Sequence, residues 1–340
     1  MNVLIVGFGI AGKFYFNLLK NKKNIKKIFV CDNINLPKHP KLQKIPFDIN
    51  KIKKNKINYA FVATPSHLHF KYSQVLLKNS INLVIEKPFV LRLSHANQLI
   101  KLSKTKKVKC WVAFQNRYNL AIQALKKLII KKTLGNIFLV DCSLVWKRDV
   151  KYYKVSWRGK YKSDGGVLTN QAIHLLDALI YTFGEIKKFN SIIEHNKKKL
   201  QAEDLAVINL IHKNNLISTL KATTRADSNY RSSMDIIGEK GRALVKGISL
   251  NTFHLLKENR IFDIEKKSEN FEIGGDAVGA MGTGHSKILK EFLNKKIKKS
   301  SKGLEIHKNL HVLKVIHSIY NQKKDLGFSY IKSKQSKLGV

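Results

Sequence analysis

The run Val3-Leu4-Ile5-Val6-Gly7-Phe8-Gly9-Ile10-Ala11-Gly12 decides the fold of this chain. Its first four residues are an apolar run typical of a buried strand, and residues 11–19 carry apolar side chains at helical spacing. Gly7 permits a tight turn, Gly9 lets another molecule approach the backbone, and Gly12 allows the helix to pack closely on the strand. The run therefore predicts a strand, a turn and a helix whose free N–H groups and positive dipole end can hold a dinucleotide pyrophosphate.

A second apolar run supports this interpretation. Ile28-Phe29-Val30-Cys31 predicts the next strand, and Asp32 follows it directly, twenty residues after Gly12. A carboxylate at this distance accepts hydrogen bonds from the adenosine ribose hydroxyls and repels a 2′-phosphate, so the sequence favours NAD over NADP. The alternative is a simple glycine turn followed by a solvated aspartate.

Strands and helices continue to alternate as far as residue 118. Tyr59–Ala63, Leu83–Ile85 and Cys110–Phe114 predict further buried strands. Ligands of an open parallel sheet bind beyond the carboxyl ends of its strands, which places Glu86-Lys87-Pro88 beside the cofactor. The proline restricts the backbone of the preceding lysine to extended conformations. We therefore predict a Rossmann dinucleotide-binding domain over residues 1–118.

The remainder of the chain, residues 119–340, predicts a second domain. A helix over residues 119–131 is followed by extended segments with period-two alternation, which suggest a mostly antiparallel sheet. A helix is expected over Thr169–Phe183, and two late helices over residues 286–294 and 305–321. The predicted fold class is α/β, with the Rossmann domain followed by an α+β domain that holds a large, mostly antiparallel open sheet.

The net charge of +41 invites a nucleic-acid interpretation, which the composition opposes. Eight of the 64 basic residues are arginine, and the other 56 are lysines scattered through the chain beside abundant Ile and Asn. Lys, Ile and Asn have AT-rich codons, so an AT-biased genome explains the charge, whereas nucleic-acid readout uses clustered Arg, interleaved aromatic residues or a known module. We expect no specific nucleic-acid partner, but a positive surface field that attracts anionic ligands.

Neither a membrane segment nor a metal cluster is expected. No stretch approaches the ~20 consecutive apolar residues of a membrane span, and the first residues lead into the glycine turn without a basic start or a cleavage site. Cys31, Cys110 and Cys142 are widely spaced in apolar runs, which suits reduced buried thiols. The expected location is the cytoplasm.

Several motifs, in their order along the chain, resemble the glucose-fructose oxidoreductase, inositol dehydrogenase and MocA family of NAD(P)-dependent sugar oxidoreductases. They are Gly7-x-Gly9-x-x-Gly12, Ala63-Thr64-Pro65-x-x-x-His69, Glu86-Lys87-Pro88, Asn116-Arg117, and Gly165-Gly166-Val167-Leu168 with His174-x-x-Asp177. Trp157-Arg158-Gly159 followed by residues 164–174 is similar to the subgroup that oxidises the 3-hydroxyl of UDP-N-acetyl-glucosaminuronic acid for surface-polysaccharide synthesis. The resemblance implies a Rossmann domain followed by an α/β domain whose open sheet mediates homodimers or homotetramers.

The resemblance also implies two catalytic residues. Lys87 matches the family lysine that hydrogen-bonds the reacting hydroxyl and stabilises developing alkoxide charge, and His174 matches the general base. Asn170 stands where many polyol-oxidising members carry aspartate, and it is expected to orient the substrate, as in the aminosugar-uronate subgroup. Without the resemblance, Lys87 could be surface charge, and His174 with Asp177 could be a polar pair one helical turn apart.

Further site residues follow from the same motifs. Guanidinium groups suit a uronate carboxylate or a diphosphate, and aromatic rings suit sugar or uracil faces. The candidate cofactor-binding residues are Gly7, Phe8, Gly9, Ile10, Ala11, Gly12, Asp32, Thr64, Pro65, His69, Glu86, Lys87 and Gln115. Structural packing is the alternative role of His69. The candidate substrate-binding residues are Lys87, Arg117, Tyr153, Trp157, Arg158, Asn170, Gln171 and His174.

The predicted function is that of an NAD-dependent dehydrogenase acting on a small sugar substrate that is anionic and nucleotide-linked. One alternative is a dehydrogenase of inositol or another free sugar, or a keto-sugar reductase, of the same family. The other alternative is a non-catalytic NAD-sensing regulator, because this fold also serves in transcriptional regulation. Retention of both Lys87 and His174 favours the enzyme.

Overall fold

The computed structural model describes residues 1–196, 200–257, 260–264, 284–322, 329–331 and 334–339. The chain divides into two units, Met1–Ala113 with Ser286–Leu310 and Phe114–His285 with His311–Val340. The sequence prediction placed the division near residue 118 and gave all later residues to the second domain. The return of residues 286–310 to the first unit depends on tertiary packing, which leaves no local signal in the sequence.

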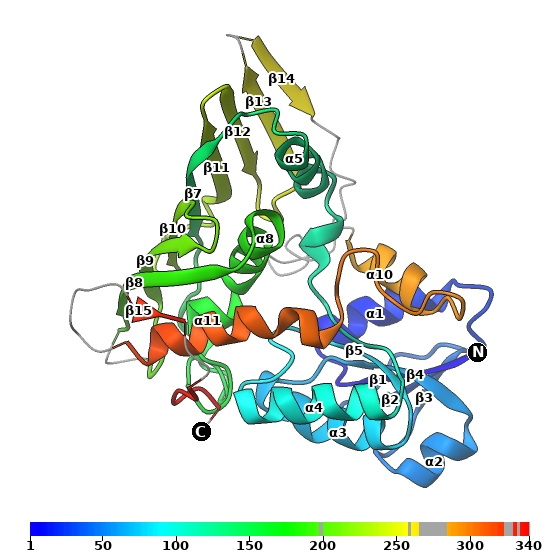
Figure 1. Cartoon of the computed structure of the whole chain (residues 1–340). Coiled ribbons are helices and arrows are strands. Elements are labelled where there is room, and N and C mark those ends of the chain that lie inside the picture. Colours follow the sequence, from blue (N-terminus) through cyan, green and yellow to red (C-terminus); the bar gives the residue numbers. More distant parts are fainter. Residues whose placement is uncertain (197–199, 258–259, 265–283, 323–328, 332–333, 340) are drawn as a thin grey trace. The chain divides into compact units, whose positions relative to one another are not determined.

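The first unit contains a parallel sheet. Its described strands are β1 (Asn2–Val6), β2 (Lys27–Cys31), β3 (Leu42–Lys44), β4 (Ile57–Val62), β5 (Asn82–Ile85) and β6 (Cys110–Val112). These six strands lie in the order β3-β2-β1-β4-β5-β6, and all neighbouring pairs are parallel (Figure 1). Leu4, Val30 and Phe61 have no exposed surface, as expected for apolar strands covered on both faces. The predicted dinucleotide-binding fold is confirmed.

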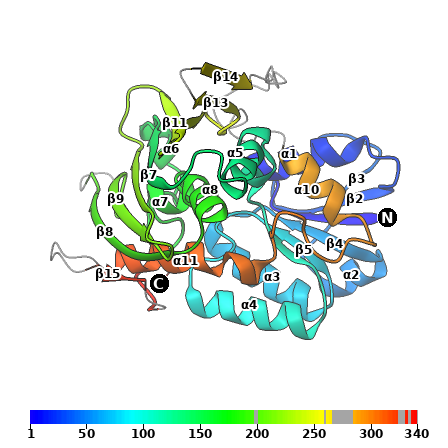
Figure 2. The ribbon, with the colours of Figure 1, turned by 45° about the horizontal axis from the view of Figure 1, so that its top comes forward.

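Helices cover both faces of this sheet. The described helical segments are α1 (Ile10–Lys20), α2 (Ile49–Lys54), η1 (Ser66–Leu68), α3 (His69–Lys78), α4 (Leu93–Thr105), α10 (Gly284–Phe292) and η3 (Ile306–Asn309). Helices α3 and α4 lie side by side on one face and α1 lies on the other (Figures 1 and 2). The Phe61 ring lies 4.9 Å from the Tyr15 ring of α1 and 5.8 Å from the Phe292 ring of α10. The returning segment therefore packs on the α1 face.

The second unit contains a larger, mixed sheet. Its described strands are β7 (Ile137–Val145), β8 (Ile186–Glu194), β9 (Leu205–His212), β10 (Ile217–Thr223), β11 (Arg231–Gly238), β12 (Gly241–Lys246), β13 (Thr252–Lys257), β14 (Arg260–Ile264) and β15 (Ser329–Tyr330). Within the described ranges, β7 and β10 are parallel and the other neighbouring pairs are antiparallel. The mostly antiparallel sheet predicted from period-two alternation is therefore confirmed.

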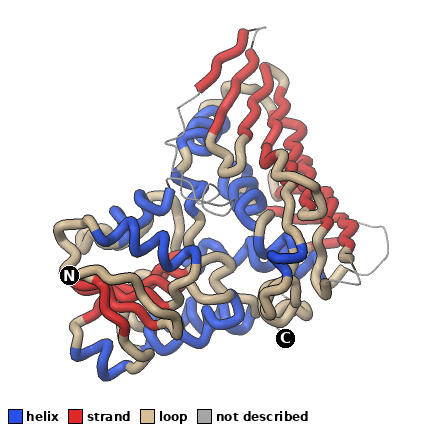
Figure 3. Tube along the Cα trace, turned by 180° about the vertical axis from the view of Figure 1, so that it is seen from behind, coloured by secondary structure: helices blue, strands red, loops and turns tan. Residues whose placement is uncertain are grey.

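The described helical segments of the second unit are η2 (Gln115–Tyr118), α5 (Leu120–Ile130), α6 (Val150–Tyr153), α7 (Val167–Asn170), α8 (Ile173–Phe183) and α11 (Leu310–Tyr320). Figure 3 shows the sheet of this unit from behind, with strands in red and helices in blue. Side chains along β10 alternate between buried and exposed, so one face of this strand is packed and the other is open to solvent. None of the helices in the described ranges is long and apolar enough to cross a membrane.

One predicted helix is divided in two. The prediction of a single helix over Thr169–Phe183 is wrong, because α7 ends at Asn170 and α8 begins at Ile173. At the break, the Ala172 N–H bonds to the carbonyl of Val167, one residue further back than in an α-helix. The side chains of Asn170 and Gln171 are engaged in tertiary hydrogen bonds with residues outside the helix. These tertiary contacts explain why the helix is interrupted although the local sequence has helical periodicity.

Candidate functional site

The carboxyl edge of the parallel sheet brings together segments that are far apart in sequence. In the strand register, Val6 pairs with both Cys31 and Val62, and Val62 pairs with Ile85. The residues that follow these strands therefore emerge at one edge. They are the glycine turn after β1, Asp32 after β2, Thr64 and Pro65 after β4, and Glu86 and Lys87 after β5.

The glycine turn has the geometry that the sequence predicts. Gly7 has a φ of 90°, and an added Cβ there would lie 2.7 Å from the carbonyl oxygen of Ala63. At Gly12 an added Cβ would overlap the carbonyl oxygen of Gly7, whereas at Gly9 it would meet no atom within 4 Å. The chain's own packing thus requires glycine at positions 7 and 12. The open space at Gly9 suits the predicted backbone approach of a ligand.

The start of α1 presents unoccupied hydrogen-bond donors. Gly9 is its N-cap, no side chain caps the helix, and its first turn holds no acidic residue. Phe8 is fully buried and Ile10 is half-exposed beside the half-buried Ala11, so the turn exposes backbone rather than large polar side chains. A pyrophosphate fits this end of the helix because both the free N–H groups and the helix dipole favour negative charge.

Asp32 is held in a fixed orientation. One carboxylate oxygen accepts a hydrogen bond from the Phe8 N–H at 2.6 Å, and the other accepts one from the Ile34 N–H at 3.0 Å. A carboxylate fixed in this way next to the glycine turn suits the ribose hydroxyls of NAD and repels an additional phosphate. Residues 7–12 would hold the pyrophosphate of NAD, and Asp32 would hold its adenosine ribose.

The Glu86-Lys87-Pro88 segment is attached to α1 through Glu86. The buried Tyr15 hydroxyl donates to one Glu86 oxygen at 2.8 Å, and the Lys87 N–H lies 3.4 Å from the other. The Lys87 side chain is half-buried, and the Lys87–Pro88 peptide bond is cis. Lys87 thus follows β5 directly at the edge of the sheet where the glycine turn also lies.

His69 connects two of the loops at this edge. Its ring is 1% exposed, with Nδ1 at 2.8 Å from the Pro88 carbonyl and Nε2 at 2.8 Å from the Thr64 carbonyl. Burial lowers the pKa of His69, and the two carbonyl contacts oppose that shift. A neutral imidazole has one N–H and can donate to only one of these carbonyls at a time. His69 therefore ties the loop after β4 to the loop after β5, beside Thr64 and Pro65.

The second unit positions the other predicted catalytic residue. His174 is the second residue of α8, and its half-buried ring meets the Phe114 ring edge-on at a centroid distance of 6.5 Å. The Asn170 amide nitrogen lies 2.9 Å from both carboxylate oxygens of the buried Asp164. The Gln115 side chain is buried, and its amide oxygen accepts no hydrogen bond from any described residue.

Tyr152 joins two of the predicted substrate-binding residues. The Tyr152 hydroxyl accepts hydrogen bonds from Arg158 and, at 3.0 Å, from the Gln171 amide nitrogen. The Arg158 guanidinium also lies close to two aromatic rings, 3.9 Å from the Tyr152 centroid and 4.4 Å from that of Trp157. Arg158, Trp157 and Gln171, which the sequence proposed separately, therefore form one cluster.

Arg117 is engaged inside the protein. Its guanidinium donates to both oxygens of Asp177, at 2.9 Å and 2.5 Å, and both side chains are almost completely buried. Burial raises the pKa of Asp177 and the Arg117 charge opposes that shift. This bidentate pair differs from the substrate contact predicted for Arg117, because the guanidinium already serves a buried carboxylate on α8. Asp177 likewise pairs with Arg117 rather than with His174.

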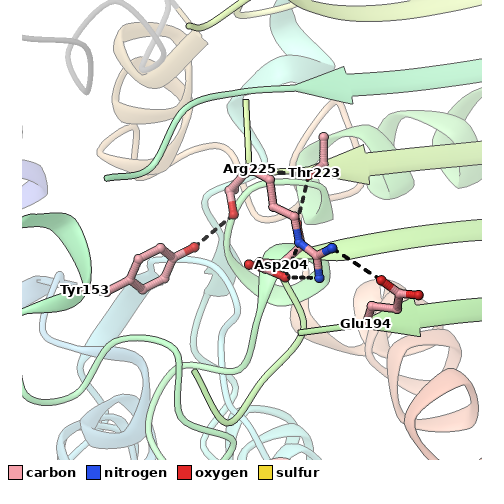
Figure 4. Close-up of polar contacts among 6 residues, drawn as sticks. Tyr153, Glu194, Asp204, Thr223 and Arg225 are labelled. Atoms are coloured by element: carbon pink, nitrogen blue, oxygen red, sulfur yellow. Dashed lines mark hydrogen bonds and ion pairs between the residues drawn. The ribbon is translucent and has the colours of Figure 1, made fainter. Parts of the chain in front are cut away.

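The Tyr153 hydroxyl makes its hydrogen bond outside the Arg158 cluster. It lies 2.9 Å from the Thr224 hydroxyl, just after β10. Beside this contact, Arg225 forms ion pairs with Asp204 at 2.8 Å and with Glu194 at 3.3 Å (Figure 4). These bonds connect the ends of neighbouring strands. The Tyr153 hydroxyl thus has a partner within the protein, and its contact with substrate stays a prediction.

Glu203 was not predicted, and it lies beneath the glycine pair that precedes α7. It is 1% exposed, and one carboxylate oxygen accepts from the Leu168 N–H at 2.9 Å and from the Tyr320 hydroxyl at 2.8 Å. Burial raises the pKa of Glu203 from 4.5 to about 7, although both hydrogen bonds oppose that shift. An added Cβ at Gly166 would overlap this carboxylate, which explains the second glycine of the motif.

The sequence contains partial signals for these additional residues. Asp164 stands directly before the Gly165-Gly166 pair, and Tyr152 stands next to the candidate Tyr153. Glu203 has no such signal, because its partners Leu168 and Tyr320 lie 35 and 117 residues away. In the part of the chain that the structure describes, no group of three or more His, Cys, Asp or Glu side chains could hold a metal ion.

Comparison with protein families gives two consecutive matches. Residues 1–114 match the model of an oxidoreductase family with an NAD-binding Rossmann fold. Residues 122–244 match the model of the GFO/IDH/MocA C-terminal domain. Together these matches cover the parallel sheet of the first unit and strands β7 to β11 of the second sheet.

Individual relatives are similar at low identity. The chain is 26% identical to glucose-6-phosphate 3-dehydrogenase of Bacillus subtilis, over 53% of this chain and 54% of that protein. It is 22% identical to myo-inositol 2-dehydrogenase of Thermotoga maritima, over 59% of this chain and 60% of that protein. The chain spans about half the length of the first curated relatives that it matches.

A solved structure of similar fold covers the whole chain. The WlbA dehydrogenase from Bordetella pertussis, crystallised with NADH and UDP-GlcNAcA, superimposes with a TM-score of 0.82 at 22% identity and covers 98% of each chain. At this level of identity the likeness concerns the fold alone.

Proposed function

Because this chain belongs to the GFO/IDH/MocA family of oxidoreductases, whose first domain is an NAD-binding Rossmann fold, we propose that it is an NAD-dependent sugar dehydrogenase. The proposed substrate is a nucleotide-linked aminosugar uronate, UDP-N-acetyl-glucosaminuronate, oxidised at its 3-hydroxyl for surface-polysaccharide synthesis. The observation that carries this choice is the set of polar contacts just before His174: Asn170 bonds to Asp164, and Gln171 shares the Tyr152 hydroxyl with Arg158. The WlbA dehydrogenase of the same fold was crystallised with this uronate and supports the choice.

In the proposed reaction, bound NAD supplies the hydride acceptor. The Lys87 ammonium donates a hydrogen bond to the reacting hydroxyl oxygen and stabilises the negative charge that develops there. His174 in its neutral form takes the hydroxyl proton at a ring nitrogen. Loss of that proton makes departure of the hydride from the same carbon easier, so the two residues act on one step.

Asp164 orients Asn170 within this arrangement. A carboxylate only accepts hydrogen bonds, so it directs the Asn170 amide hydrogens toward itself. An aspartate at position 170 would instead place a second carboxylate against Asp164 at about the same distance, and the two charges would repel. The chain is thus adapted to asparagine at this position, as proposed for the aminosugar-uronate subgroup.

The curated relatives favour a second candidate. Two of them are named for activity on glucose 6-phosphate and on myo-inositol. A dehydrogenase of a free or phosphorylated sugar would use Lys87 and His174 in the same way. The two kinds of substrate would present different chemical groups to Arg158. Measuring the turnover of both kinds therefore distinguishes the two candidate functions.

The test measures NADH formation by the purified protein with NAD and UDP-N-acetyl-glucosaminuronate, in parallel with glucose 6-phosphate, myo-inositol and glucose. An α-keto acid should be present in a parallel sample to reoxidise any cofactor that remains bound. Lys87→Ala should abolish turnover, and Lys78→Ala, an exposed lysine on α3, is the matched control. Turnover of the uronate alone supports the proposal, and turnover of another sugar alone selects the second candidate. NAD binding without turnover of any sugar contradicts both and favours a non-catalytic regulator.

A further inference from the structure

Tyr152 has an unusual set of neighbours. Its hydroxyl oxygen receives hydrogen bonds from Arg158 Nη1 and Gln171 Nε2. Two guanidinium groups lie over its ring, with the Arg158 carbon 3.9 Å and the Arg148 carbon 5.3 Å from the ring centroid. A second ring, that of Tyr153, packs against it edge-on at 5.0 Å. Tyr152 is therefore held firmly in one position.

The phenol hydrogen of Tyr152 points away from the two groups that bond to its oxygen. A guanidinium group carries only donors, and an amide nitrogen is also a donor. Both groups therefore occupy lone pairs of the phenol oxygen, and the phenol's own hydrogen must point elsewhere. Among the residues that the structure describes, no oxygen accepts a hydrogen bond from this hydroxyl.

The surroundings of this hydrogen favour an anion. Arg148 and Arg158 are both half-buried, so their charges are less screened than charges on an open surface. The nearby carboxylate of Asp164 is engaged with Asn170. Burial raises the pKa of Tyr152 to about 12, so the hydroxyl keeps its proton near neutral pH. The cluster thus offers a hydrogen-bond donor beside two cations.

The cluster is attached to the segment that carries the proposed general base. Gln171 lies three residues before His174, and it is bonded to the Tyr152 hydroxyl. A ligand oxygen that accepts the phenol hydrogen would therefore be bound next to the segment that holds His174. Tyr152 takes no part in the proposed reaction step itself.

We propose that Tyr152 is a substrate-binding residue whose hydroxyl, held by Arg158 and Gln171, donates a hydrogen bond to an anionic oxygen of the sugar substrate. This inference rests on the proposed function and adds to it the group that distinguishes anionic from neutral sugars. A carboxylate and a phosphate offer the same chemistry to a phenol and two guanidinium groups. The substrates used in the test separate these two sources.

The test compares Tyr152→Phe with Tyr230→Phe in the NADH-loaded protein. Both changes remove one tyrosine hydroxyl of the second unit, but Tyr230 is exposed and its hydroxyl donates to Asp227. Isothermal titration should measure binding of UDP-N-acetyl-glucosaminuronate, UDP-N-acetyl-glucosamine, glucose 6-phosphate and myo-inositol. Thermal unfolding of each variant checks that it is folded.

Tyr152→Phe should weaken binding of anionic sugars about 10-fold or more, because a hydrogen bond to a charged group is lost. Binding of myo-inositol should stay within about twofold of wild type, and Tyr230→Phe should change the binding of neither kind of sugar. A loss confined to the uronate identifies a carboxylate as the acceptor, and an equal loss for UDP-N-acetyl-glucosamine or glucose 6-phosphate identifies a phosphate. In turnover, KM should rise while kcat changes little.

Three results would overturn the inference: equal effects of the two variants, equal losses for anionic and neutral sugars, or wild-type protein that binds none of the anionic sugars. The proposed function fails differently, when the uronate yields no NADH with wild-type protein. In that case a selective loss of glucose 6-phosphate binding in Tyr152→Phe would still support the role of Tyr152.

Discussion

Replacing Glu203 by glutamine should remove a pH dependence from the stability of the second unit. Burial raises the pKa of this carboxyl from 4.5 to about 7. One of its oxygens accepts hydrogen bonds from Leu168 at the start of α7 and from Tyr320 of α11. Glutamine keeps an oxygen that can accept both bonds and has nearly the same shape, but it cannot ionise.

The sign and size of the effect follow from the two pKa values. In the unfolded chain Glu203 loses its proton near pH 4.5, whereas in the folded chain it keeps the proton until about pH 7. Glu203 therefore stabilises the folded chain fully below pH 4.5, and this stabilisation is lost as the pH rises through about 7. Each pH unit in between lowers the free energy of unfolding by about 1.4 kcal/mol, so the full loss is about 3 kcal/mol.

The assay is urea unfolding of wild type and Glu203→Gln at several pH values between about 5 and 8. Tryptophan fluorescence follows the unfolding of both units, because Trp146 and Trp157 lie in the second unit and Trp111 in the first. The free energy of unfolding of the variant, minus that of wild type, should grow by about 2–3 kcal/mol across this range. Glu239→Gln, which changes an exposed carboxyl, should show no such growth. A difference for Glu203→Gln that stays constant to about 0.5 kcal/mol would refute the raised pKa.

Three other substitutions test contacts elsewhere in the chain. Arg117→Met leaves the buried Asp177 without its cation, so urea titration should show a loss of about 3–5 kcal/mol, and a loss below about 1 kcal/mol would contradict the ion pair. His69→Ala should weaken NADH binding in a fluorescence titration about 10-fold, because the two loops lose their link, whereas the exposed His67→Ala should not. Asp32→Ala should raise the affinity for NADPH relative to NADH about 10-fold or more, since the fixed carboxylate no longer repels the extra phosphate, and an unchanged ratio of dissociation constants would argue against that role.

The nucleotide-binding edge could be predicted because its information is local. Each strand is an apolar run, and parallel strands end at one edge of the sheet. The turn at Gly7, the acid Asp32 and the Glu86-Lys87-Pro88 segment each follow a strand directly. No knowledge of distant contacts is needed to place these residues together.

Contacts in the second unit depend on tertiary structure. Arg117 and Asp177 are 60 residues apart, and no local pattern in the sequence pairs them. An arginine in a cluster of motifs suggested an anionic substrate, yet the same guanidinium satisfies a buried carboxylate. A buried charge must be paired, so this partner takes precedence over a ligand. The sequence alone does not show which side chains are buried, so it cannot predict that Arg117 binds Asp177.

The neighbouring residues Tyr152 and Tyr153 show why substrate recognition is the least predictable part. Consecutive residues of a helix point in directions about 100° apart, so two adjacent tyrosines face different surroundings. In α6 the first meets Arg158 and Gln171, and the second meets Thr224. Because α6 spans only Val150–Tyr153, it offers no periodicity from which its orientation could be deduced. Segments of this kind can change their side chains without disturbing either sheet, so one family can keep its nucleotide-binding edge while its members differ in the sugars they bind.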